Sequence, residues 1–154
     1  MKKVQAILFA ALVTCAVACS KEKVLDNRLN GNTWNIDSIE WVKTESDFSG
    51  FSYAAGTENN AGTFKFDETT GSSTMTIDGE TEENVSFSWN VSSDASQLEM
   101  TYDLTIDATG SNQRVMVIEE NKRKRQVWIL TEQQFDLETQ EAYQLVAEIT
   151  LTKQ

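Results

Sequence analysis

The chain has 154 residues, a net charge of −11 at pH 7, no histidine, and two cysteines that both lie within the first 19 residues. Without histidine or any later cysteine, Ser/His/Asp and Cys/His catalytic sites and zinc sites are excluded, and the acidic surface disfavours nucleic acid. We therefore expect a protein that is not an enzyme and that uses neither a metal nor a cofactor.

Residues 1–18 have the pattern of a secretory signal peptide. Two lysines come first, and the apolar run over residues 4–13 is too short for a membrane span, which needs about 20 residues. Small residues then lead to Ala18 and Cys19, a stretch that resembles a bacterial lipobox. The resemblance implies that the signal is removed and that the Cys19 thiol takes a diacylglyceryl group. The alternative is an ordinary signal peptide that is cut near Ala18.

Removal of residues 1–18 leaves 136 residues with a net charge of −13, enough for one domain with a hydrophobic core. Residues 19–30 are polar and mixed in charge, and we interpret them as the lipidated N-terminus and a tether. In lipoproteins of this type, Ser20 rather than aspartate after the cysteine implies the outer membrane. We therefore expect anchoring through acyl chains on Cys19, on the periplasmic face or the cell surface.

Residues 31–154 are predicted to form one β domain. The apolar residues of its first strand are at even positions up to Ile36 and at odd positions from Ile39. A bulge or bend between them would place all of these residues on one side of the strand. Gly31 and Trp34 at the start of this strand resemble the opening of the lipocalin-like domain of Gram-negative lipoproteins. In that family the tryptophan plugs the closed end of a barrel, and most members lack a defined activity.

Residues 44–61 are predicted to be a long irregular loop, because glycine and asparagine interrupt any periodicity. Loops of this length are often functional. The lipocalin resemblance implies a lid over the barrel mouth, and the alternative is a surface loop. The aromatic residues of this segment are Phe48, Phe51 and Tyr53.

The rest of the chain alternates between apolar and polar residues in short runs separated by turns such as Asp78-Gly79. The predicted strands cover residues 63–67, 74–78, 84–91, 98–106, 114–119, 123–131, 135–137 and 143–151. One apolar and one polar face per strand indicate an all-β antiparallel fold. We predict an up-and-down, lipocalin-like β-barrel, with a β-sandwich as the alternative.

Large apolar side chains on the alternating faces would either fill the barrel or hold one small apolar ligand. The candidate ligand-binding residues are Trp34, Phe48, Phe51, Tyr53, Phe64, Phe66, Met75, Phe87, Trp89, Met100 and Tyr102. The alternative function is a protein-interaction or structural module of an outer-membrane complex, with an unknown protein partner. The basic run at residues 122–125 is interpreted as a solvated hairpin tip.

The anchoring hypothesis predicts a mature protein that begins at acylated Cys19. Intact-mass analysis of protein purified from its own membranes should give the mass of residues 19–154 plus acyl chains. Cys19→Ser is the control, and it should abolish the acyl mass because the thiol is the attachment point. An unmodified Cys19 or a different N-terminus would contradict the hypothesis.

Overall fold

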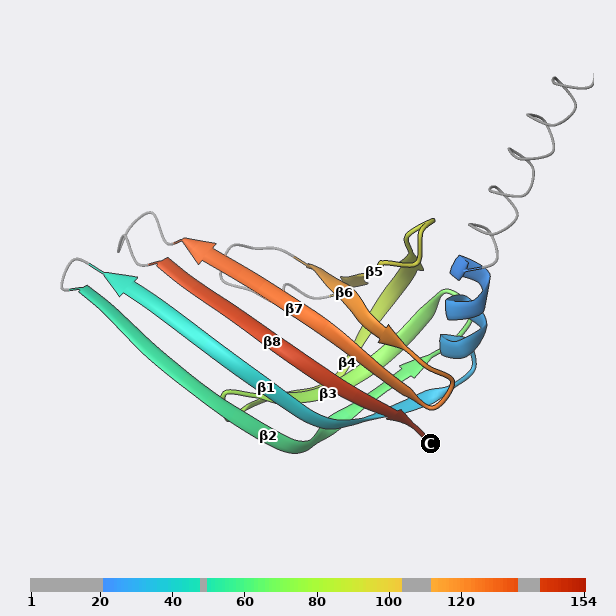
Figure 1. The fold of residues 1–154 in the computed structure, drawn as a ribbon, viewed down its shortest axis with the longest axis horizontal. Helices are drawn as coiled ribbons and strands as arrows, with labels where there is room; N and C mark the ends of the chain where they lie inside the picture. Colours follow the sequence, from blue (N-terminus) through green and yellow to red (C-terminus); the bar gives the residue numbers. More distant parts are fainter. Residues whose placement is uncertain (1–20, 48–49, 104–111, 136–141) are drawn as a thin grey trace, which may run out of the picture.

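The computed structural model describes residues 21–47, 50–103, 112–135 and 142–154, and within these ranges eight strands form a closed antiparallel barrel. The strands are β1 (Thr33–Asp47), β2 (Gly50–Phe66), β3 (Thr70–Ile77), β4 (Glu80–Val91), β5 (Gln97–Tyr102), β6 (Gln113–Asn121), β7 (Arg125–Phe135) and β8 (Ala142–Lys153). Each strand pairs with its neighbours in sequence, and β8 returns to pair with β1 (Figure 1). This confirms the predicted up-and-down barrel, the topology of lipocalins, and rules out the sandwich.

The predicted bulge in β1 is present. The register of β1 against both β2 and β8 shifts between Ile36 and Ser38. As a result Trp34, Ile36 and Ile39 are fully buried and Trp41 is 8% exposed, so all four lie on the inner face of one strand. The predicted turn at Asp78-Gly79 is also present, and both residues have the positive φ that a tight hairpin requires.

Aromatic rings from three strands, β2, β4 and β7, fill the part of the barrel next to a helix that residues 21–29 form. The contacts of Phe66 with Phe87, Trp89 and Trp128 have centroid distances of 5.3 to 6.1 Å and edge-to-face geometry. Phe64 packs on the same cluster, 5.4 Å from Trp128. Such pairs stabilise a core beyond the area that they bury. This cluster is called the aromatic floor below.

The predicted tether is wrong for residues 21–29, which form a helix. Leu25 and Leu29 are four residues apart, so they lie on one helical face, and both are fully buried in the barrel core. The Arg28 guanidinium donates to the backbone and side-chain oxygens of Asn121, which ties the helix to the β6–β7 hairpin. The helix therefore covers one end of the barrel (Figure 1). Residues 1–20, including Cys19, lie outside the described residues.

None of the helical residues that the structure describes forms a segment long and apolar enough to cross a membrane. The basic run after Asn121 is, as expected, a hairpin tip with local ion pairs. Lys122 and Arg125 both pair with Glu120 there. Such exposed pairs contribute less than about 1 kcal/mol each.

The predicted loop over residues 44–61 is also wrong for residues 44–47 and 50–61, which continue β1 and β2 as paired strands, and residues 48 and 49 lie outside the described residues. Lys43 is opposite Ala54, Thr44 is opposite Tyr53, and further pairs follow toward the tip. The glycines and asparagines that suggested a loop are accommodated at special positions. Asn60 has a positive φ beside the bulge, and Gly56 lies directly under the Trp41 ring.

The barrel is deeper on one side than on the other. β2 pairs with β3 only over Gly62–Phe66, and β6 pairs with β7 over Met116–Asn121, whereas β1, β2, β7 and β8 remain paired far beyond these segments. The order β2-β1-β8-β7 thus continues as a four-stranded sheet away from the helix-covered end (Figure 1). β7 also runs unbroken to Phe135, where two shorter strands were expected.

The aromatic floor predicts a large stability loss for Trp89→Ala. Trp89 is 8% exposed, packs 5.3 Å from Phe66, and donates its indole N–H to the carbonyls of Asp67 and Thr70. The free energy of unfolding should fall by about 3–5 kcal/mol, as for other large-to-small core changes. Chemical denaturation measures this, with Phe51→Ala as a surface control that should change stability by less than about 0.5 kcal/mol. A loss below roughly 1 kcal/mol for Trp89→Ala would contradict the packing.

Candidate ligand-binding site

Eight of the residues predicted to bind a ligand are buried inside the barrel with at most 8% exposure. They are Trp34, Phe64, Phe66, Met75, Phe87, Trp89, Met100 and Tyr102. Four of them, Phe64, Phe66, Phe87 and Trp89, belong to the aromatic floor, and the Tyr102 ring packs 5.5 Å from Phe87. These residues therefore fill the barrel in this half. Val85, which has the same parity as Phe87, is only partly buried.

The aromatic residues of the predicted lid do not line the barrel. Phe51 is 86% and Tyr53 is 71% exposed. They lie opposite Ser46 and Thr44, whose side chains are on the outer face of β1. Directly opposite residues share a face of the sheet, so Phe51 and Tyr53 point away from the barrel. Phe48 lies outside the described residues.

The inner face above the floor combines an apolar centre with charged edges. One cross-strand row contains Trp41, Ala147 and Leu130, all buried. The next row outward places Lys43 and Glu132 on either side of buried Leu145. Side chains that are directly opposite across strands share a face, so these rows form one continuous surface, called the inner face below.

Arg114 is the most buried charged side chain among the described residues, with 5% exposure. Its two terminal nitrogens donate to both carboxylate oxygens of Glu82 at 2.7 and 2.9 Å, and its Nε donates to Glu132 at 2.6 Å. The guanidinium also lies 5.3 Å from the centre of the Tyr102 ring. Bidentate Arg–carboxylate pairs fix geometry as well as charge, so this network has one defined arrangement.

The sequence interpretation missed this network for a local reason. Asn84 has a positive φ, and the register of β3 against β4 shifts between Ser73 and Met75. The shift places Glu82 opposite buried Met75, whereas regular alternation from Val85 would have pointed it outward. Arg114, in contrast, has the parity of buried Met116, and this signal was available in the sequence.

Burial and neighbouring charges shift several pKa values at the inner face. Burial alone would lower the pKa of Arg114, but its hydrogen bond with Glu82 and the charge of Glu132 outweigh this effect and raise it. Burial raises the pKa of Tyr102 although the Arg114 charge opposes it. Burial, together with the Glu132 charge, raises the pKa of Tyr143 to about 12. At neutral pH Arg114 is therefore charged and both tyrosines are neutral.

A second charged group lies across the inner face, on the β1 side. Lys43 is 3.0 Å from both Glu45 and Asp78, and its nitrogen lies 5.3 Å from the centre of the Tyr143 ring. The hydrogen bonds to Glu45 and Asp78 raise the pKa of Lys43. The Gly79 backbone N–H donates to Glu58 at 3.1 Å. These contacts hold the tip of the β3–β4 hairpin against β1 and β2.

Two buried indole nitrogens have no hydrogen-bond partner among the described residues, those of Trp34 and Trp41. Trp34 lies at the helix-covered end, and Trp41 lies on the inner face. A Cβ on Gly56 would approach within 2.6 Å of the Trp41 ring, so glycine is required where the indole crosses β2. A buried N–H without an acceptor costs about 1–3 kcal/mol. Among the described residues, Trp41 carries the one buried side-chain donor above the floor that has no partner.

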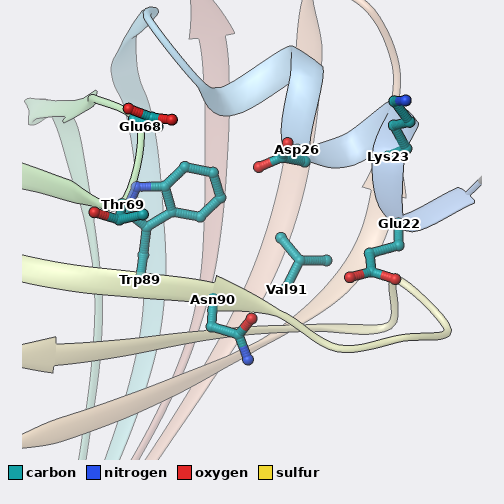
Figure 2. Close-up of a pocket in the computed structure, with 8 residues that line it drawn as sticks. All are labelled: Glu22, Lys23, Asp26, Glu68, Thr69, Trp89, Asn90 and Val91. Carbon is teal, nitrogen blue, oxygen red and sulfur yellow. The ribbon is translucent and has the colours of Figure 1, made fainter.

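A separate surface hollow of about 480 Å³ lies between the helix and β4 (Figure 2). Glu68 and Asp26 lie on either side of the Trp89 indole there, and Glu22 lies farther away, beyond Val91. The indole N–H already has two carbonyl acceptors, so it offers no free donor to this hollow. In the described part of the chain, no group of three or more acidic or cysteine side chains is placed to hold a metal ion.

No protein-family profile matches the sequence, and no protein with a curated description matches it. Among solved structures, an uncharacterized protein from Bacteroides eggerthii aligns with a TM-score of 0.44 and 10% identity, over 80% of this chain and 98% of that one. A lipocalin-like protein from Bacteroides uniformis aligns with a TM-score of 0.44 and 9% identity, over 82% and 99%. A redesigned β-barrel aligns with a TM-score of 0.35 and 14% identity, over 84% and 94%. The fold assignment rests on the strand pairing itself.

The Arg114 network predicts a stability loss for Arg114→Met. Removal of the cation leaves Glu82 and Glu132 facing each other in a largely buried place, and the free energy of unfolding at pH 7 should fall by roughly 3 kcal/mol. Urea denaturation at pH 7 measures this. The control, R114M/E82Q/E132Q, should recover most of the loss at pH 7, and an unchanged loss in that variant would contradict the electrostatic explanation.

Proposed function

We propose that the mature protein is a lipid-anchored, non-enzymatic protein of the cell envelope whose barrel binds a small, largely apolar molecule on the inner face. The observation that carries this proposal is the division of the barrel into a filled floor and an inner face with buried Trp41, Leu145 and Ala147 between two charged groups. Ligand sites typically combine an apolar lining with a few polar groups that fix orientation. Small barrels are either filled by side chains or hold one small ligand.

The position of the helix supports a particular orientation on the membrane. The described part of the helix starts at Lys21, two residues after Cys19, and it covers the end of the barrel opposite to the end of β1 and the start of β2 (Figure 1). Two residues span at most about 7 Å. Acyl chains on Cys19 would therefore hold the helix-covered end near the membrane, and the inner face would open away from it. A ligand would then enter from the aqueous phase and not from the bilayer.

The charges on the inner face favour binding over catalysis. Arg114 is held by Glu82 and Glu132, and Lys43 is held by Glu45 and Asp78. Each cation thus lies within a set of carboxylates that fixes its position. The chain has no histidine to transfer protons near neutral pH. This arrangement is suited to orient a bound molecule.

The outer face supports an alternative role as a protein-interaction module. Phe51 and Tyr53 are 86% and 71% exposed, and Val42 and Val146, at 39% exposure each, are paired on the same outer face. A hollow of about 400 Å³ lies beside Phe51. Exposed aromatic residues are enriched in protein interfaces, so F51A/Y53A is the variant that would test this role.

Native mass spectrometry of protein purified from its own cells tests the ligand-binding proposal. We expect a co-purifying small molecule that is lost in Leu145→Trp, because this substitution fills the inner face. Val146→Trp adds the same ring one residue later, on the outer face, and should retain the molecule. Circular dichroism would verify that both variants fold. Only apo protein in the wild type, with no thermal shift across a panel of apolar compounds, would contradict the proposal.

A further inference from the structure

We propose that the outer face of β2, β1, β8 and β7 is a homodimer interface, in which Phe51 of each copy inserts into a hollow on the outer face of the other. The partner of this face is therefore a second copy of this chain. The inference is independent of the ligand-binding proposal, because it uses the opposite face of the same strands. It gives a function to the two most exposed aromatic side chains among the described residues, those of Phe51 and Tyr53.

Exposed apolar side chains are concentrated on one side of the barrel. Seven large apolar side chains of the described residues are at least 39% exposed, and one of these, Val24, lies on the helix. The other six point outward from β1, β2, β6 and β8, and they are Val42, Phe51, Tyr53, Val115, Val117 and Val146. Contiguous apolar patches on the surface of a protein mark interaction sites.

The four strands bring uncharged side chains together in three rows on this outer face (Figure 1). Residues that are directly opposite across strands share a face. From β2 to β7, the rows are Ala55, Val42, Val146 and Thr131; Tyr53, Thr44, Gln144 and Gln133; and Phe51, Ser46 and Ala142. None of these side chains carries a charge, although the chain has 24 acidic and 13 basic residues. The three rows are called the outer patch below.

The lack of charge favours a second copy over a partner of opposite charge. A basic partner would be attracted to the acidic parts of the surface, and the outer patch offers it no carboxylate. Two copies of this chain, each with a net charge of −11, repel one another and can meet most closely where neither carries charge. Glu40 and Glu148 lie opposite one another in the next row toward the helix-covered end, so the outer patch has an acidic border on that side.

Phe51 and the hollow beside it are complementary in shape. Phe51 is 86% exposed, and the hollow of about 400 Å³ extends from it across β1 and β8 to Gln133 on β7. Ser46 and Ala142, which follow Phe51 in its row, have small side chains and form part of the lining. A cavity of about 150 Å³ accepts benzene, so the hollow has room for a phenyl ring from another molecule.

A two-fold axis parallel to the strands would fill both hollows at once. Phe51 and Ala142 lie on either side of Ser46 in one row, so rotation about an axis over β1 places Phe51 of each copy above Ala142 of the other. Such an interface uses the same patch on both copies and closes at the dimer. The axis also keeps both helix-covered ends on one side, as two copies anchored through Cys19 in one membrane require.

The size of the outer patch indicates a weak dimer. Its three rows contain fewer residues than the roughly 20–30 per side of a standard interface. We therefore expect a dissociation constant in the micromolar range. Anchoring of both copies in one membrane would raise their effective concentration and favour the dimer there.

Sedimentation velocity of protein purified from its own membranes in a neutral detergent tests the inference. We expect a monomer–dimer equilibrium whose dissociation constant rises about 30-fold or more in Phe51→Ala, the effect of truncating an interface hot spot. Ala142→Trp should also weaken the dimer, because it fills the hollow and leaves Phe51 in place. Val24→Ala and Ser88→Trp are the matched controls at exposed positions outside the outer patch, and they should dimerise like wild type. Thermal unfolding of each variant would verify the fold.

Disulfide crosslinking in intact membranes gives a second readout. Ser46 lies close to the proposed axis, so Ser46→Cys should yield a product of twice the protein mass under mild oxidation. Ser88→Cys, on the outer face of β4, should not. Wild type provides the background for Cys15 and Cys19.

Salt distinguishes a second copy from an oppositely charged partner. Raising the salt from about 0.05 to 0.5 M should tighten the dimer, because it screens the repulsion between the borders at Glu40 and Glu148. The inference would be overturned by a monomer up to millimolar concentration, by a dimer that Phe51→Ala leaves unchanged or salt weakens, or by a Ser46→Cys product of another mass. Each of these results would leave the ligand-binding proposal standing, and an apo inner face would leave the dimer standing.

Discussion

The register shift between Ile36 and Ser38 in β1 is the constraint on which the rest of the barrel depends. A regular strand would turn Trp34 and Trp41 to opposite faces, because they are separated by an odd number of residues. The extra residue brings both to the inside. One strand thus contributes to the core at the helix-covered end and to the inner face above the floor. The pairing of β1 with β2 and with β8 shifts at the same place. The pairing of β1 with β8, which closes the barrel, therefore depends on this bulge.

A second bulge shapes the other side of the inner face. The positive φ of Asn84 turns Glu82 inward, where it binds Arg114 together with Glu132. Buried ion pairs generally add little stability compared with apolar residues of the same volume. The network therefore fixes the positions of these three charged side chains and makes this edge of the inner face polar, more than it stabilises the fold. Core stability comes from the aromatic floor and the two helix leucines.

The sequence allowed the strand order, the β1 bulge and most floor residues to be predicted, because period-two alternation directly reports a half-buried sheet. It did not allow the helix to be predicted, since Leu25 and Leu29 stand among charged residues and only their contact with the barrel reveals them. The β1–β2 hairpin was mistaken for a loop because Gly56 is required there by the Trp41 ring and not by a turn. The Arg114 network was hidden by the bulge at Asn84, which changes parity without a signal in the residue pattern.

We propose that the inner face, and not the outer face, binds a small molecule. A crystal structure of the protein purified from its own envelope would decide between the two faces. We expect elongated electron density against Trp41 and Leu145, between the Arg114 and Lys43 groups. An inner face packed solely by the protein's own side chains, with extra density only beside Phe51 and Tyr53, would contradict it.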